Sequence, residues 1–202
     1  MDARPKDAPA VIDQLAERCL VHVKNRFGFE LDFTPDTLGV VDHFLEEVVV
    51  EEAGGNMPPP AHRRRSHLVH LLAPTVGAYF GEVMRGYLRC RWRIPSDDPR
   101  EWLLEFEQFF LRFNPAGAAA EAVFQAPVEE WSGALVAAPG QVVALHERLA
   151  AAPPLPEDQF FSLATRFEVL QIVDDWLRQQ SAVEDGPLCC TEADYDAVFG
   201  AP

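Results

Sequence analysis

The stretch TVGAYFGEVMRGYLRCRWRIPSDDPREWLLEFEQFFLRF, residues 75–113, contains the change of periodicity that decides the fold. Its first part spaces apolar residues by about 3.6 positions, as on one face of a helix, and its second part alternates them about every 2 positions, as in strands. The helical part extends back to residue 62 and predicts a long helix over 62–89, which Pro74 should kink or split. The alternating part predicts an antiparallel sheet with strands at 91–94, 102–106 and 109–113.

Helical patterns flank this stretch on both sides. They predict further helices at 10–26, 36–52, 114–126, 141–151 and 157–180, and a short strand at 29–33. Because helices and strands occur in separate runs, we expect an α+β fold, in which a small antiparallel sheet packs against several helices and the last long helix is acidic and amphipathic. We expect a single domain over 1–182 and a partly mobile acidic tail over 183–202, in which Tyr195 to Phe199 can dock as a turn of helix.

Two further features of the opening stretch concern packing. Gly77 and Gly81 lie one turn apart, and small residues at that spacing let another backbone approach closely, so we expect this turn to be buried. The aromatic residues of the strand region resemble a cofactor site only superficially, and we interpret them as sheet core: Trp102, Phe106, Phe109, Phe110 and Phe113.

The charge of the chain is negative and unevenly distributed. The formal net charge is −15; residues 1–101 carry 13 basic and 16 acidic side chains, and residues 102–202 carry 4 and 16. Such a field repels phosphate backbones and favours basic partners. We therefore expect no nucleic-acid binding, and a basic protein is the kind of partner that the charge favours.

The chain has no apolar run near the ~18 residues that a membrane span requires. Residues 1–9 are polar and are followed by no apolar signal core, and the four cysteines suggest reduced thiols rather than a disulfide scaffold. We expect a cytoplasmic protein that does not contact a membrane.

Two segments carry a resemblance to known proteins. LDFTPDTLGVVDHFLEE at 31–47 and GAYFGEVM at 77–84 resemble a class of uncharacterised bacterial helix-and-sheet proteins with a GAY-aliphatic-GE helix motif, although Phe80 stands at the aliphatic position here. Some proteins of that class resemble immunity or accessory proteins of bacterial toxin systems. The resemblance implies a small helix-and-sheet domain of unknown activity.

Histidines and carboxylates offer an alternative based on metal chemistry. His43 lies near Asp42, Glu46 and Glu47 on one predicted helix, and His67 and His70 lie one turn apart on another. Side chains three and four apart on a helix point the same way and can share a metal ion. Because His43 and its acids fall opposite the apolar positions, we interpret them as a solvated face, and we predict no metal or cofactor.

Two other clusters have both a structural and a functional interpretation. Arg63, Arg64 and Arg65 form the only dense basic run, which can bind an anion or form salt bridges with the acidic helix or a partner. Cys189 and Cys190 are vicinal and can respond to oxidation, but their acidic neighbours raise a thiol pKa and argue against a reactive thiolate.

The predicted helix at 157–180 bears most directly on function. Its polar side carries Glu168, Asp174 and Asp175, which we predict to lie on the surface and to bind a partner. No nucleophile elbow, HExxH or phosphate-binding glycine motif occurs, so we predict no catalytic residue. Two hypotheses follow: a non-enzymatic interaction or immunity-type protein that acts through an acidic surface, or a metal-dependent or hydrolytic enzyme built on His43, His67, His70 and nearby carboxylates.

Overall fold

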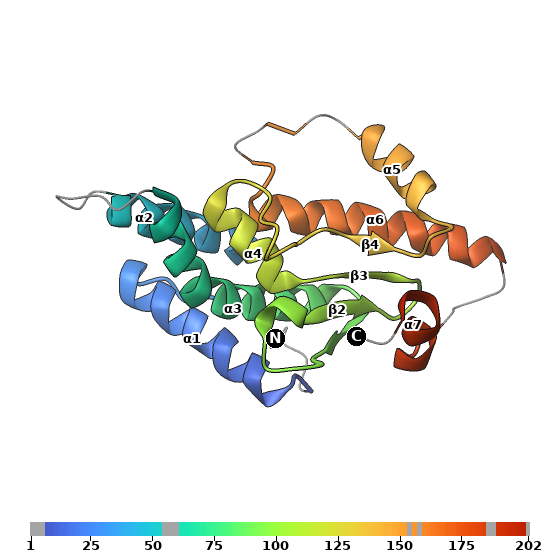
Figure 1. Ribbon diagram of the computed structural model, residues 1–202, viewed down its shortest axis with the longest axis horizontal. Coiled ribbons are helices and arrows are strands. Elements are labelled where there is room, and N and C mark those ends of the chain that lie inside the picture. Colours follow the sequence, from blue (N-terminus) through green and yellow to red (C-terminus); the bar gives the residue numbers. More distant parts are fainter. Residues whose placement is uncertain (1–6, 54–60, 153–154, 157–158, 185–188, 201–202) are drawn as a thin grey trace.

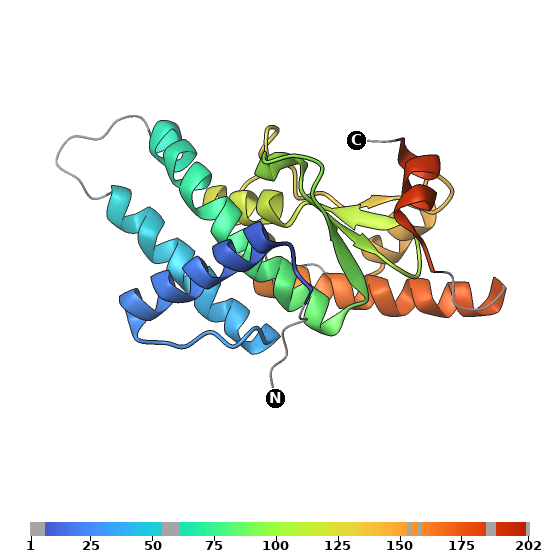
Figure 2. The same cartoon turned by 90° about the horizontal axis from the view of Figure 1, so that it is seen from below.

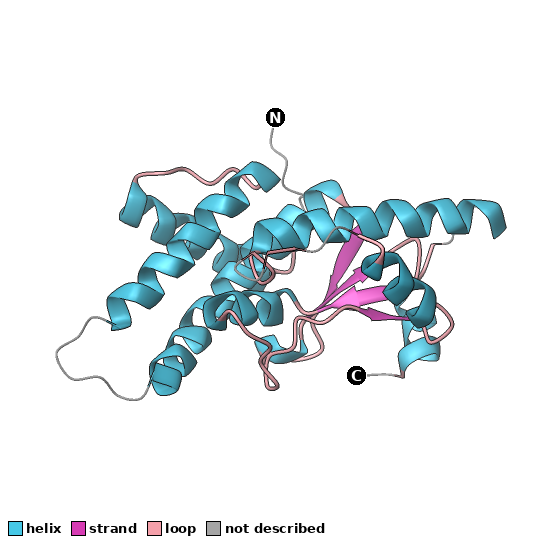
Figure 3. Ribbon diagram, turned by 90° about the horizontal axis from the view of Figure 1, so that it is seen from above, coloured by secondary structure: helices cyan, strands magenta, loops and turns pink. Residues whose placement is uncertain are grey.

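The computed structural model describes residues 7–53, 61–152, 155–156, 159–184 and 189–200. Within them the chain has the predicted α+β fold, in which helices surround one small antiparallel sheet (Figures 1 and 3). The α-helices are α1 (Ala10–Phe27), α2 (Leu38–Ala53), α3 (Ala61–Tyr87), α4 (Pro115–Phe124), α5 (Val142–Ala150), α6 (Leu163–Glu184) and α7 (Glu192–Phe199). The strands are β1 (Cys90–Arg93), β2 (Leu103–Phe106), β3 (Leu111–Phe113) and β4 (Val136–Ala137).

The sheet has the strand order β1-β2-β3-β4, and every neighbouring pair is antiparallel. The three predicted strands and their direction are confirmed. Alternation along the strands gives the sheet an apolar face, formed by Cys90, Trp92, Leu104, Phe106, Leu111 and Phe113, all of which are buried. The opposite face carries Arg91, Arg93, Glu105 and Arg112.

The predicted aromatic core is also largely confirmed. Trp102, Phe106, Phe109 and Phe113 are buried, and Phe110 is half-buried against Tyr195 and Phe199. These rings therefore belong to the packing of the sheet and its surroundings.

α3 is the central helix, and α1, α2 and α4 all pack against it. Figures 1 and 2 show α1 and α2 at one end of the molecule and the strands with α7 at the other. Pro74 lies inside α3 without dividing it. The hydroxyl of Thr75 donates a hydrogen bond to the carbonyl oxygen of Leu72, three residues earlier. In the described part of the chain, no helix is long and apolar enough to cross a membrane.

Two elements differ from the sequence prediction. Residues 29–33 are irregular rather than a strand, because Phe33 adopts a left-handed conformation (φ 60°) and its N–H donates to the hydroxyl of Tyr79 at 3.1 Å. β4 was not predicted, because its two residues are too few to show an alternating pattern.

The acidic helix α6 begins at Leu163 instead of residue 157. Residues 157 and 158 lie outside the described part, and Phe160 and Phe161 precede the helix, with Phe160 54% exposed. The start is fixed by Asp42 of α2, whose carboxylate accepts hydrogen bonds from the first two helical N–H groups. A cap supplied by a residue more than a hundred positions away cannot be seen in the local sequence.

Candidate functional site

The GAYFGE segment of α3, residues 77–82, lies at the centre of the packing. A Cβ added at Gly77 would lie 2.4 Å from the Cα of Ala116 in α4, and one added at Gly81 would lie 2.1 Å from the ring of Trp92 in β1. Both positions therefore require glycine because of close approach, as the sequence predicted. The two glycines seat α4 and β1 against α3.

The polar residues of the same segment also serve packing. The hydroxyl of Tyr79 accepts the N–H of Phe33 and lies 2.6 Å from the hydroxyl of Thr37, so it fixes the loop before α2. Glu82 is fully buried, accepts the indole N–H of Trp92 at 2.8 Å, and pairs with Arg85 at 2.9 Å. The segment that carries the family resemblance thus has a structural explanation at each of these positions.

The histidines do not come together. His43 is exposed, stacks on Phe27 with 5.2 Å between ring centroids, and has Glu46 at 3.9 Å from its Nδ1. His67 is exposed, and His70 packs against the ring of Trp131. Among the residues that the structure describes, no group of three or more His, Cys, Asp or Glu side chains is arranged to hold a metal ion.

Asp42 departs from the predicted solvated face. Its carboxylate oxygens accept the N–H groups of Leu163 and Ala164 at 2.8 and 3.0 Å, which caps α6. Burial raises the pKa of Asp42 to about 6, and these two hydrogen bonds oppose the shift only in part. Asp42 therefore joins α2 to α6, and this joint titrates in a mildly acidic range.

The predicted acidic surface of α6 requires one correction. Asp174 is 3% exposed and forms an ion pair with Arg178 at 2.7 Å, so it does not lie on the surface. It lies on the same side of α6 as the buried residues Val173 and Leu177, which pack in the hydrophobic core. Glu168 and Asp175 are exposed, as predicted.

The other arginine of α6 is also directed inward. Arg166 pairs with the buried Glu121 of α4 and donates to the carbonyl oxygen of Gly133 at 3.0 Å. Glu121 also accepts the N–H of Gly133. Both described arginines of the helix are thus held by buried carboxylates, which leaves Glu168 and Asp175 as exposed negative charges on either side of Ile172, a side chain that is 42% exposed.

The predicted basic cluster lies in the first turns of α3. Arg63, Arg64 and Arg65 fall within Ala61–Tyr87, but their side chains are outside the described part of the chain. Their anion-binding and salt-bridge interpretations therefore stay predictions.

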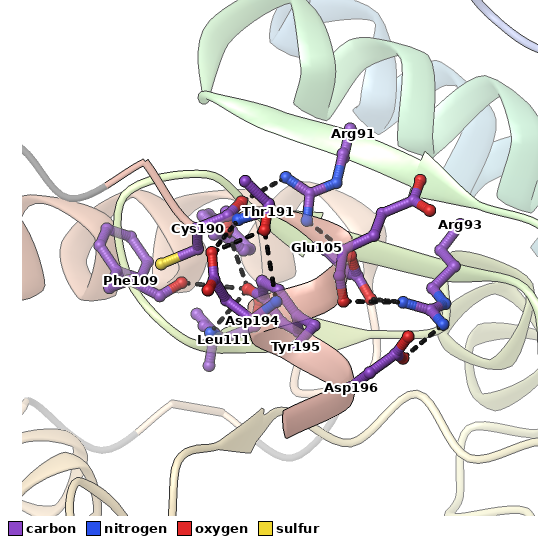
Figure 4. A network of polar contacts seen from close by, with 12 residues as sticks. Arg91, Arg93, Glu105, Phe109, Leu111, Cys190, Thr191, Asp194, Tyr195 and Asp196 are labelled. Carbon is purple, nitrogen blue, oxygen red and sulfur yellow. Dashed lines mark hydrogen bonds and ion pairs between the residues drawn. The ribbon is translucent and has the colours of Figure 1, made fainter. Parts of the chain in front are cut away.

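A second charged cluster, which the sequence did not suggest, covers the polar face of the sheet. We call Arg91, Arg93, Glu105 and Arg112 the arginine face. Figure 4 shows the first three of these residues. Arg91 donates to Glu105 Oε2 at 2.9 Å, and Arg93 lies 3.6 Å from Oε1 of the same fully buried carboxylate. Alternation along each strand gives part of the signal for this cluster, because residues two apart share a face. The register that pairs Arg91 and Arg112 with Glu105 comes from the structure.

α7 lies on the arginine face and is anchored by Tyr195, which is fully buried. The Tyr195 hydroxyl lies 2.7–3.0 Å from the carbonyl oxygens of Phe106, Phe109 and Leu111 and accepts the N–H of Leu111. The docking that we expected for Tyr195 to Phe199 is therefore present. The docked helix is longer than the expected turn and begins at Glu192.

The vicinal cysteines lie at the start of this segment. Cys189 is exposed and Cys190 is buried, and all four cysteines are free. Burial, with Asp194 nearby, raises the pKa of the Cys190 thiol, as the acidic surroundings predicted. The main-chain groups of Cys190 are used structurally, since its N–H donates to the carbonyl oxygen of Glu107 and its own carbonyl oxygen accepts from Arg91.

Comparisons of the chain with protein-family models, curated proteins and solved structures give no match.

Proposed function

We propose that this chain is a non-enzymatic protein-interaction module that binds a basic partner through Glu168, Ile172 and Asp175, which we call the α6 acidic face. The narrower form of the proposal is an immunity or accessory role in the cytoplasm. The observation that carries it is the pairing of Arg166 and Arg178 with buried carboxylates, which leaves this face without a compensating cation of its own helix.

The composition of the face suits a protein partner. Ile172 is an exposed apolar side chain, and Glu168 and Asp175 lie one turn to either side of it on the same face of the helix. An apolar contact bordered by carboxylates matches a partner surface with an apolar residue between lysines or arginines. The net charge of −15 adds long-range attraction for such a partner.

The free cysteines support the cytoplasmic location. All four remain unpaired in the structure, and disulfides are rare in a reducing compartment.

The test is a charge reversal with a matched control. Glu168→Lys/Asp175→Lys changes the net charge from −15 to −11, and so does Glu129→Lys/Glu130→Lys, at two exposed carboxylates of the loop after α4. The unaltered chain, cross-linked in cell extract, identifies the partner, and purified partner is then used to measure association rates at low and high salt.

We expect the α6 variant to lower the association rate at low salt by about tenfold and by much less at high salt, because screening weakens exposed charge interactions. The loop variant should change the rate by less than about twofold. Equal effects of the two variants would show that only net charge matters and would reject the α6 acidic face as the binding surface.

A further inference from the structure

α7 is bound to the arginine face in the way a peptide ligand is bound. Asp196 accepts a hydrogen bond from Arg93 at 2.6 Å, and the Tyr195 ring lies under the Arg91 guanidinium, 5.5 Å from the ring centroid (Figure 4). The Phe199 ring lies under the Arg112 guanidinium, 4.3 Å from the ring centroid. The contacts thus combine one carboxylate and two aromatic rings four residues apart with three arginines. This pattern defines a recognisable ligand chemistry.

The start of α7 is capped within its own segment and is also held by the sheet. Thr191 and Asp194 form a reciprocal capping box that satisfies the N–H groups of both residues. Arg91 and Arg93 donate to the carbonyl oxygens of Cys190 and Glu192. The ion pair of Asp196 is also open to solvent, since 38% of the Asp196 side chain is exposed. If the helix leaves the sheet, the capping box stays intact, and the groups that lose a partner are the carbonyl oxygens bound by Arg91 and Arg93 and the N–H of Cys190.

The arginine face is not fully satisfied by α7. Among the residues that the structure describes, Oε1 of Glu105 and Nε of Arg91 are buried and have no hydrogen-bond partner, although Oε1 lies 3.6 Å from Arg93. Arg112 contacts the Phe199 ring but has no hydrogen bond or ion pair with any residue that the structure describes. Buried polar atoms without partners weaken a docked state, and a guanidinium without an acceptor remains available to a further carboxylate.

We propose that the arginine face is a binding site for an acidic, aromatic segment of a partner protein, and that α7 is a self-ligand which competes for it. The ligand is a short helix with an aromatic residue followed by a carboxylate, a second aromatic residue four positions after the first, and a further carboxylate that reaches Arg112. This site is on a different element from the α6 acidic face and selects the opposite charge, so it goes beyond the function proposed above.

A partner is favoured over a second copy of the chain as the competing occupant. The α7 of a second copy makes the same contacts as the resident α7, and the resident one has the advantage of a tether, which corresponds to an effective concentration of about millimolar. A partner segment with the additional carboxylate gains a contact that α7 lacks. It is the occupant that can win the competition.

The experiment uses a labelled peptide of residues 189–200, with serine at the two cysteine positions, and full-length protein. Fluorescence anisotropy measures binding of the peptide to three forms of the protein. The first is the unaltered chain, and the second is Tyr195→Ala/Asp196→Ala, in which the resident α7 is weakened. The third adds Arg93→Ala to that double variant. Asp196→Lys alone serves as a milder host, and near-ultraviolet circular dichroism checks that each chain is folded.

We expect both hosts with a weakened α7 to bind the peptide at least tenfold more tightly than the unaltered chain, and Arg93→Ala to reverse most of that gain. Equal binding to the unaltered and weakened hosts, or binding indifferent to Arg93→Ala, would overturn the proposal. A concentration-dependent dimer of the unaltered chain that Tyr195→Ala abolishes would assign the face to a second copy and would also overturn it.

Discussion

The contact between α3 and α4 and the contact between α7 and the sheet are built on opposite principles. In the first, Gly77 brings the backbone of α4 close to α3, so the interface depends on shape and excludes almost any larger side chain. In the second, Arg91, Arg93 and Asp196 hold a short helix largely by charge around one buried anchor, Tyr195. The comparison teaches that the first contact specifies the fold, whereas the second can be exchanged and is suited to recognition.

The largest expected effect is at the close helix contact. Gly77→Ala places a Cβ where the backbone of Ala116 and Pro115 already lies, at 2.4–2.9 Å, and backbone cannot move aside as a side chain can. We expect a loss of about 3 kcal/mol in the free energy of unfolding, measured by urea denaturation. The control is Gly39→Ala, at an exposed helical position with open space around it, which should be neutral or slightly stabilising. If the two variants lost the same stability, the close-contact explanation would fail.

The buried ion pair between Arg166 of α6 and Glu121 of α4 lies in the helical part of the molecule. Replacing its residues tests whether every contact made by charge can be exchanged. Arg166→Met leaves Glu121 buried without its cation, and we expect a loss of about 2–3 kcal/mol in the free energy of unfolding. Glu121→Gln/Arg166→Met removes the unpaired charge while keeping an acceptor for the Gly133 N–H, and should recover much of the loss in the same denaturation assay. If Arg166→Met were as stable as the parent protein, the ion pair would not contribute to the stability of the fold and would resemble the contacts of α7.

Asp42 gives a smaller, pH-dependent effect at the joint between α2 and α6. Burial raises its pKa to about 6, above the value of about 3.9 expected in the unfolded chain. The folded state therefore binds this proton more tightly, and the resulting stability is present below about pH 4 and is lost as the pH rises through about 6. The difference in the free energy of unfolding between the parent and Asp42→Asn should change by about 2 kcal/mol over this window. Parallel stability curves for the two proteins would contradict the raised pKa.

Tyr195→Phe should have the most local effect. The variant keeps the buried ring but removes the hydroxyl that contacts the carbonyl oxygens of the β2–β3 turn and accepts the Leu111 N–H. We expect α7 to open more easily by about 1–2 kcal/mol, seen as faster hydrogen exchange at residues 192–199. Exchange in α3 should be nearly unchanged. Equal acceleration in α3 would mean that α7 is part of the cooperative core.

The sequence was a good guide where a pattern is local. The change of period in residues 75–113 predicted α3 and the antiparallel strands, and the spacing of Gly77 and Gly81 predicted their burial. The alternation in β1 places Arg91 and Arg93 on one side of that strand, but only the register of the sheet brings Glu105 and Arg112 to the same side.

The sequence failed where one residue depends on a distant partner. The sequence pattern predicts Asp42 to lie on the surface, but its carboxylate caps α6. The pattern places Asp174 in a polar stripe, but its side chain is buried and pairs with Arg178. Likewise, the anchoring of α7 depends on carbonyl groups of the β2–β3 turn that meet the Tyr195 hydroxyl. Such contacts are set by tertiary packing, which leaves no periodic signal in the chain.

The most direct test of the difference between the two contacts is native-state hydrogen exchange of the unaltered protein at about 50 mM and about 500 mM NaCl, a range over which exposed charge interactions are strongly screened. The account predicts that amides of α3 near Gly77 exchange only through global unfolding, with little dependence on salt. Amides of α7 should exchange by local opening and several-fold faster at the higher salt concentration. Exchange in α7 at the same free energy as in α3, without a salt effect, would show that α7 is a fixed part of the fold and would contradict the account.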